Sequence, residues 1–231
     1  MKRMLAIETS AETCSAALAV DGDVRERFEH APLRHAELIL PMISGLLAEA
    51  GLRAGDLDAI AFGRGPGSFT SLRIGIGVVQ GLAWGADRPV VPVSSLAAVA
   101  QGVVVARSVP ATARILVAMD ARMGEVFHAA FRPDDDGRVV PDGEEGVCAP
   151  ESLSPPGEWL AAGNGFERYQ ALSRLAESAS ACLPGIWPRA AAVLELAKAW
   201  LETNDPLNAA MAQPVYIRND VAEKPDLSAA E

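Results

Sequence analysis

Short apolar runs alternate with polar turns at the start of the chain. The runs at residues 4–9 (MLAIET) and 14–20 (CSAALAV) are separated by a polar turn. Asp21-Gly22 then leads into a third run at residues 24–28, and this dipeptide is typical of a two-residue hairpin. The pattern therefore predicts three strands joined as hairpins.

Helical spacing begins after these strands. Residues 34–50 carry apolar side chains at intervals of three and four, which predicts an amphipathic helix that ends at Gly51. A buried strand at 58–63, a glycine-bearing helix at 70–85, a strand at 90–93 and a helix at 95–106 follow. Hairpins followed by alternating helices and strands predict a mixed sheet with helices over its faces.

The second half of the chain repeats this organisation. Residues 114–120 (RILVAMD) parallel residues 4–8, because each apolar strand ends in a carboxylate. Further strands and helices are expected at 125–132, 138–147, 159–163, 166–177 and 189–202. We therefore expect an α/β protein of two duplicated mixed-sheet units, with a first lobe at 1–106 and a second at 107–231.

Composition narrows the class of protein. The chain has 231 residues, of which 50% are hydrophobic, and its formal net charge is -10. A chain this acidic is not expected to hold a nucleic-acid backbone without a more basic partner. Three widely spaced cysteines favour a reducing compartment, and no apolar run approaches the ~18 residues that span a bilayer. The sequence therefore predicts a cytoplasmic protein with no membrane partner.

The most unusual segment is FGRGPGSFTSLRIGIGVVQGL, at residues 62–82. Its Gly-Pro-Gly turn ends the preceding strand, and Ser68 or Thr70 is expected to accept amide hydrogens as the N-cap of the next helix. Gly77, Gly81 and Gly85 then fall on one stripe of that helix, where each costs about 1 kcal/mol relative to alanine. The stripe predicts close packing of another helix backbone, from this chain or from a partner.

The two strand ends that carry a carboxylate suggest a central cleft. Glu8 and Asp120 stand where proteins of the actin, sugar-kinase and Hsp70 type hold a metal–nucleotide complex. Neither carboxylate is followed directly by a glycine, and the glycine turn lacks the lysine of a GxxxxGK[ST] loop. Two interpretations stay open at this point: a nucleotide site used by an ATPase or kinase, or polar strand ends that face the cleft.

Metal chemistry has little support in the sequence. The three histidines are His30, His35 and His128, and no H-E-x-x-H motif occurs. We expect no metal site and no catalytic residue, and a metallopeptidase is kept only as a remote alternative.

Motifs along nearly the whole chain resemble the TsaB (YeaZ) family. They are LAIETS, CSAAL, HAELILPMI, FGRGPGSFTSLRIGIGVVQGLA, VSSL, AMDARMGEVFHA, GNG, PRA and PVYIRNDV. The resemblance implies a two-lobed actin/Hsp70-like (RNase H-like) fold. It also implies a role in the synthesis of N6-threonylcarbamoyladenosine at position 37 of tRNA. In that system TsaD is the homologous transferase subunit and TsaE an ATPase of the assembly. A TsaB protein is the noncatalytic partner and scaffold of TsaD and also pairs with itself.

These observations together assign two groups of candidate residues. A partner interface on the helices at 34–50 and 70–85 is expected to use His35, Leu38, Ile39, Met42, Leu46, Arg73, Gly77, Gly81 and Gly85. A vestigial nucleotide cleft is expected to include Glu8, Thr9, Gly65, Gly67, Ser68, Asp120, Gly163 and Gly165. No cofactor is assigned firmly, and a nucleotide at the interface with the partner is kept open.

Two residues depart from the usual pattern of the family. Glu8 stands where the family generally has aspartate, which weakens the case for a nucleotide in the first lobe. Ser71 stands where the family generally has glycine, and we expect it to adjust packing at the start of the helix. Contact with tRNA is expected only through the assembled complex.

Overall fold

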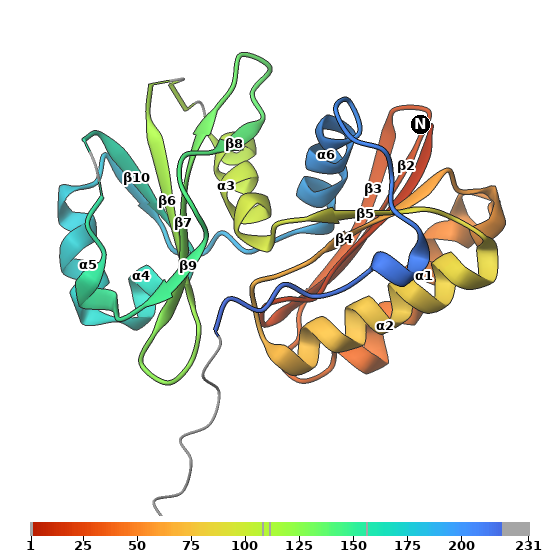
Figure 1. Cartoon of the computed structure of the whole chain (residues 1–231), viewed down its shortest axis with the longest axis horizontal. Helices are drawn as coiled ribbons and strands as arrows, with labels where there is room; N and C mark the ends of the chain where they lie inside the picture. Colours follow the sequence, from red (N-terminus) through yellow and green to blue (C-terminus); the bar gives the residue numbers. More distant parts are fainter. Residues whose placement is uncertain (1, 108, 111, 156, 219–231) are drawn as a thin grey trace, which may run out of the picture.

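The computed structural model describes residues 2–107, 109–110, 112–155 and 157–218 as two β-sheets with helices between and outside them (Figure 1). The first sheet has five strands in the order β3-β2-β1-β4-β5. Its strands are β1 (Arg3–Glu8), β2 (Thr13–Val20), β3 (Asp23–His30), β4 (Ala59–Gly63) and β5 (Val90–Val93). β1, β2 and β3 are antiparallel neighbours, as the hairpin pattern predicts, whereas β4 and β5 continue the sheet in parallel.

The second sheet repeats the pairing pattern of the first. Its order is β11-β10-β6-β7-β8, and β9 also pairs with β7. The strands are β6 (Arg114–Asp120), β7 (Val126–Pro133), β8 (Val139–Pro141), β9 (Gly146–Cys148), β10 (Trp159–Ala162) and β11 (Ala181–Leu183). β6 has an antiparallel neighbour on one side and a parallel neighbour on the other, as β1 has. The expected duplication of a mixed-sheet unit is confirmed.

The helices complete a layered, two-lobed molecule. α1 (His35–Glu49) and α2 (Phe69–Ala86) cover the outer face of the first sheet, and α4 (Gly165–Arg168) and α5 (Gln170–Leu175) cover that of the second (Figure 1). α3 (Ser95–Ala106) and α6 (Ala190–Trp200) lie between the two sheets and pack against each other. Short 3-10 turns lie at Ala54–Asp56, Pro150–Ser152, Ala176–Ser178 and Ala209–Met211.

The two central helices are exchanged between the halves of the chain. α3 belongs to the first half but packs on β6, β7 and β8, whereas α6 belongs to the second half and packs on β1, β2 and β4. The first amide groups of α6 are bound by the first sheet, because Ala190 N donates to Ser15 Oγ at 3.0 Å and Ala191 N to Glu26 Oε1 at 3.0 Å. The division at 106/107 stays a prediction, and this exchange joins the lobes through one continuous core.

Side-chain alternation explains why β1 is apolar throughout. Met4 and Ala6 face the central helices, whereas Leu5 and Ile7 face α1 and α2. Because both faces of the strand are covered, a continuous apolar run replaces the usual apolar–polar alternation. β6 repeats this arrangement in the second lobe.

Three local predictions in the second lobe are corrected. The strand expected at 138–147 is two strands, β8 and β9, because Pro141 ends β8 and Gly143 follows with φ +133°. The helix expected at 166–177 is divided into α4 and α5 at Tyr169, which has extended φ and ψ. β11 was not predicted. The end of the expected second lobe, after residue 218, lies outside the described residues.

Candidate functional site

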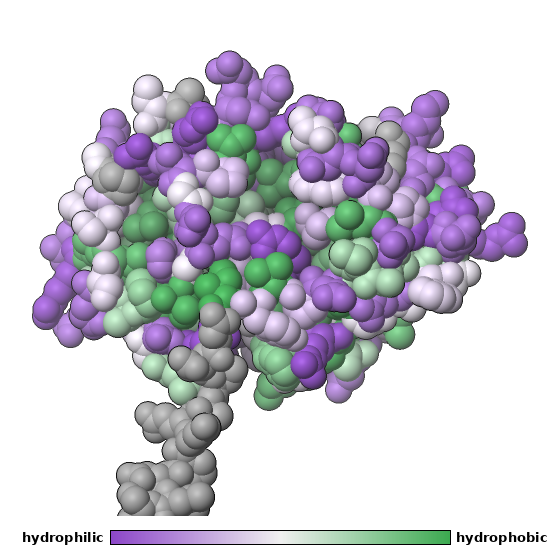
Figure 2. Space-filling view, in the orientation of Figure 1, coloured by the Kyte–Doolittle hydropathy of each residue, from purple (hydrophilic) through white to green (hydrophobic). Residues whose placement is uncertain are grey.

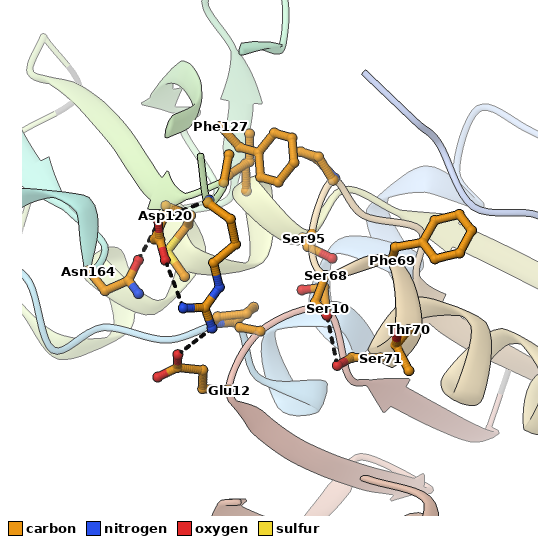
Figure 3. A pocket seen from close by; sticks show the side chains of 18 of the residues that line it. Ser10, Glu12, Ser68, Phe69, Thr70, Ser71, Ser95, Asp120, Phe127 and Asn164 are labelled. Carbon is orange, nitrogen blue, oxygen red and sulfur yellow. Dashed lines mark hydrogen bonds and ion pairs between the residues drawn. The ribbon is translucent and has the colours of Figure 1, made fainter. Parts of the chain in front are cut away.

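A cavity of about 590 Å³ lies between the two lobes. It is lined by the turn after β1, the start of α2, the start of α3, the turn after β6 and the chain near residue 216. Figure 3 shows Asp120 and Asn164 on one side, and Ser10, Ser68 and Phe69 on the other. Its size is that of a small-molecule site, and its walls are mostly apolar with a few polar groups.

The residues expected in a nucleotide cleft divide into two groups. Gly67, Ser68 and Asp120 line the cavity. The other five are not among its lining residues: Glu8, Thr9, Gly65, Gly163 and Gly165. The structure therefore brings only part of the predicted set to the cavity.

Asp120 lies at the end of β6 and is fully engaged by its neighbours. Its Oδ1 accepts from Tyr169 OH at 2.6 Å and from Arg122 N at 3.0 Å, while its Oδ2 lies 3.2 Å from Arg168 Nε. Burial and the bond to this carboxylate raise the pKa of Tyr169 to about 12, so the phenol keeps its proton and donates. The Asp120 side chain is only 4% exposed. It acts here as the centre of a local network.

Arg122 carries this network across the cleft. Its guanidinium lies 3.5 Å from Asp120 Oδ2 and donates to Glu12 Oε1 at 2.9 Å, which links the second lobe to the first (Figure 3). Sequence reasoning missed Glu12, Arg122, Arg168 and Tyr169. Only the folded chain shows that they meet, because these residues come from different turns and helices.

Glu8, the other strand-end carboxylate, is buried within the first lobe. Its Oε1 accepts from Ser10 N at 2.6 Å and its Oε2 from Ser95 Oγ at 2.9 Å. Burial raises the pKa of this carboxyl from its ordinary value of 4.5, although hydrogen bonds to Ser10 and Ser95 work in the opposite direction. Glu8 therefore positions the turn after β1 against the start of α3.

The raised pKa of Glu8 predicts a pH-dependent stability. The folded chain binds this proton more tightly than the unfolded chain, so the free energy of unfolding should fall as pH rises above about 4.5, and level off above the folded-state pKa. Glu8→Gln cannot ionise and should remove this fall. Urea unfolding from pH 4.5 upward measures both profiles.

Glu49→Gln is the matched control, because Glu49 is exposed and pairs with Arg27 on the surface. We expect its profile to parallel that of the unchanged chain. If the Glu8→Gln profile were also parallel to it, Glu8 would not be the group that binds the proton.

The cleft glycines are required by the chain's own backbone. A Cβ on Gly67 would lie 2.3 Å from the Ser10 carbonyl oxygen. A Cβ on Gly163 or Gly165 would lie 2.6 or 2.8 Å from the carbonyl oxygen of Ala118. These glycines let two segments of this chain approach each other, which needs no phosphate.

The start of α2 differs from the predicted cap. Ser68 occupies the N-cap position, but its side chain makes no capping bond and instead accepts from Ser71 Oγ at 3.1 Å. Thr70 lies inside the helix. Ser71, the departure from the family pattern, therefore contacts the Ser68 hydroxyl at the start of the helix.

Four of the residues expected in the partner interface are buried within the first lobe. His35, Ile39, Met42 and Leu46 have exposed fractions of 2%, 0%, 8% and 0%. The last three belong to the core beneath α1 and α2. His35 Nε2 donates to the carbonyl oxygens of Ala11 (2.9 Å) and Thr13 (3.1 Å). These four side chains are therefore not exposed on the surface of the free chain, and their part in a partner interface stays a prediction.

The rest of the expected interface lies on or near the outer face of α2. Arg73, Gly77, Gly81 and Gly85 are exposed, and Leu38 is half-buried. A Cβ on any of these three glycines would meet no atom within 4 Å. The glycine stripe therefore has no packing partner within the described part of the chain.

Two large apolar side chains of α1 and α2 are exposed and were not predicted. Trp84 on α2 is 76% exposed and Leu40 on α1 is 52% exposed. Both residues lie in segments that the sequence predicts as helices. An apolar residue that falls outside the core-facing stripe of such a helix is the signal that could have identified them. We name the exposed α2 residues Arg73, Gly77, Gly81, Trp84 and Gly85 the glycine face.

Apolar side chains are also exposed at the lower edge of the molecule. Figure 2 shows green surface at this edge, near the turn after β6 and the start of α2. Met123 and Phe69 lie in these two segments and are 73% and 53% exposed.

Two further findings concern metal ions and membranes. Among the described residues, no group of three or more His, Cys, Asp and Glu side chains is placed to hold a metal ion. Within the same part of the chain, no helix combines the length and apolar character that crossing a bilayer requires.

Comparison with known proteins gives consistent matches. The model of the family "TsaD: tRNA N6-adenosine threonylcarbamoyltransferase" matches residues 29–176. The tRNA threonylcarbamoyladenosine biosynthesis protein TsaB of Escherichia coli is 40% identical over 96% of this chain and 97% of its own length. The TsaB of Haemophilus influenzae is 38% identical over 96% and 95% of the two chains. The solved structure of YeaZ from Pseudomonas aeruginosa superimposes with a TM-score of 0.86 at 39% identity, over 94% of this chain and 100% of the other.

Proposed function

The chain belongs to the TsaB (YeaZ) family and takes part in tRNA threonylcarbamoyladenosine biosynthesis, and we propose that it does so as a noncatalytic partner of a TsaD-like transferase subunit. The observation that carries the partner role is the glycine face. It presents helix backbone without side chains over Gly77, Gly81 and Gly85, beside the exposed Trp84. Glycines in line on a helix allow another helix to approach closely, and exposed aromatic side chains are common anchors at protein interfaces.

The polar groups of the cleft support a noncatalytic role. The Asp120 carboxylate is bound by Tyr169, Arg122 and Arg168, and the Glu8 carboxylate is bound by Ser10 and Ser95. The donors on both oxygens of Asp120 leave it little capacity for a metal–nucleotide complex, and Glu8 is buried and is not among the cavity-lining residues. The glycine turns are likewise filled by the chain's own carbonyl groups.

The glycine face could serve two assemblies, the complex with the TsaD-like subunit and a homodimer. In the absence of the transferase subunit, we infer that two copies of this chain pair through their glycine faces, since the exposed backbone and Trp84 would otherwise face water. A TsaE-like ATPase is proposed to join the complex of this chain with the TsaD-like subunit. Contact with tRNA is proposed to come through that complex, because the chain has a formal net charge of -10.

A second candidate function is ATP binding in the cavity between the lobes, which is favoured by the cavity's position at the ends of β1 and β6. A nucleotide held where this chain meets the transferase subunit is a variant of the same idea. The two candidates differ in what the purified chain does alone.

Reconstitution of tRNA modification distinguishes them. Transferase subunit, ATPase, tRNA and cofactors are combined with and without this chain, and the chain is also assayed alone with ATP and tRNA. We expect modified adenosine only in the complete mixture, and neither ATP turnover nor product from the chain alone. Turnover by the chain alone would favour the second candidate, and full modification without the chain would contradict the partner role.

A further inference from the structure

Residues 212–218, named the strap here, cross the cleft after the last 3-10 turn. The strap is extended, and Val215, Tyr216, Ile217 and Arg218 form one wall of the cavity. Figure 1 shows this blue segment passing from α2 in the first lobe toward the turn after β6 in the second. A wall made by a segment without regular secondary structure can move without unfolding either lobe.

The strap is held at both ends and, in its middle, by a backbone hydrogen bond of Val215. Ala212 is fully buried, and its carbonyl accepts from Gln80 Nε2 at 2.7 Å. Beyond it, Val215 N donates to the Arg64 carbonyl at 2.8 Å. At the far end the Arg218 guanidinium pairs with Glu125 and lies 3.4 Å from the Arg122 carbonyl oxygen. Val215 and Tyr216, 37% and 44% exposed, lie between these ends.

The turn that receives Arg218 has an uncommon backbone. Arg122 and Met123 have φ values of 64° and 55°, in the left-handed region that favours glycine. Such a conformation costs free energy and persists where surrounding contacts hold it. Arg218 supplies contacts of this kind, since it reaches both the Arg122 carbonyl and the Met123 sulfur (3.6 Å). The strap thus holds part of the second lobe.

Arg73 connects the strap to the glycine face. Its Nε donates to Tyr216 OH at 3.2 Å, and its guanidinium carbon lies 3.9 Å from the centroid of the Phe69 ring. The Tyr216 ring lies 5.5 Å from that of Phe69. Arg73 is also one helical turn before Gly77 on α2, so a protein that docks along the glycine stripe meets the same guanidinium.

We propose that the strap is a lid over the cavity, and that docking of a partner on the glycine face detaches it by engaging Arg73. In the free chain the lid is closed, and Tyr216 occupies Arg73 and Phe69. In the docked chain Arg73 turns to the partner, Val215 leaves Arg64, and the cavity opens beside the start of α2. The inference rests on the proposed function for the identity of the docking face. Thermodynamic linkage requires that whatever detaches the lid also favours docking.

Tyr216→Ala in the full-length chain tests the lid, with Arg138→Ala as matched control. Arg138 pairs with Glu202 on the surface at 2.8 Å and touches neither the strap nor the cavity lining. In the free chain we expect Tyr216→Ala to lower the hydrogen-exchange protection of the Val215 amide by about tenfold, because one side-chain hydrogen bond and a ring contact are lost. The variant should bind the TsaD-like subunit about fivefold more tightly, since the lid no longer competes. Arg138→Ala should change neither.

Hydrogen exchange of the unchanged chain, measured after addition of the TsaD-like subunit, tests the lid directly. We expect the Val215 amide to lose protection when the complex forms. If it keeps its protection while Gly81→Leu abolishes binding, the lid is overturned and the docking face stands. If Gly81→Leu leaves binding unchanged, the docking face fails, and the proposed coupling fails with it. Unchanged affinity of Tyr216→Ala would also overturn the coupling.

Discussion

Replacing Gly81 with leucine should weaken binding of the TsaD-like subunit by about ten- to a hundredfold, because overpacking a close contact costs about 1–3 kcal/mol. The stability of the isolated chain should not fall. A Cβ on Gly81 would meet no atom within 4 Å, and the position is exposed in the middle of α2. Leucine is also a far better helix former than glycine, so the free energy of unfolding should rise by up to about 1 kcal/mol. Calorimetric titration and urea unfolding measure the two effects.

Gly185→Leu provides the control for Gly81→Leu. Gly185 is an exposed glycine of the second lobe, away from the glycine face, and a Cβ there would also meet no atom within 4 Å. It adds the same apolar side chain without changing α2, so partner affinity should stay as in the unchanged chain. Equal affinity of the Gly81→Leu variant would remove the glycine face from the interface.

Gly67→Ala, unlike Gly81→Leu, should destabilise the chain, and we expect the free energy of unfolding to fall by about 1–3 kcal/mol. The added Cβ would lie 2.3 Å from the Ser10 carbonyl oxygen, which is backbone and cannot turn away as a flexible side chain would. Relief requires the turn after β1 to separate from the start of α2, and this also breaks the bond from Ser68 N to the Ser10 carbonyl. Urea unfolding should show the loss.

Gly77→Ala is the matched control for this loss. It is the same substitution ten residues further along, at an exposed helix position with no atom within 4 Å of the new Cβ. Alanine should raise the free energy of unfolding there by about 1 kcal/mol. If both variants were equally stable, close backbone approach would not be the reason for glycine at position 67.

The sequence predicted the sheets well because their signals are local. The apolar runs that end at Glu8 and Asp120, and the Asp21-Gly22 hairpin, each lie within a few residues, and the central strands of both sheets follow from them. The exchange of α3 and α6 could not be predicted in this way. It depends on which sheet each helix covers, and an apolar helix face suits either sheet.

The site was predicted less completely, for a related reason. The apolar residues of α1 repeat at helical spacing, but spacing alone does not distinguish a core stripe from a docking stripe. Ile39, Met42 and Leu46 therefore appeared as interface candidates, although they pack against the chain's own sheet. The Arg122 and Arg218 contacts depend on arginine side chains that reach partners around a hundred residues away along the chain. Nothing in the local sequence predicts such pairs.

The central claim is that this chain supports tRNA modification by docking through the glycine face. The rate of tRNA modification, measured with increasing amounts of the Gly81→Leu variant, tests it most directly. If the chain only has to be bound, the variant should reach the same maximal rate as the unchanged chain, at about ten- to a hundredfold higher concentration. An unchanged concentration dependence would contradict the account, since it would mean that this chain does not dock through the glycine face.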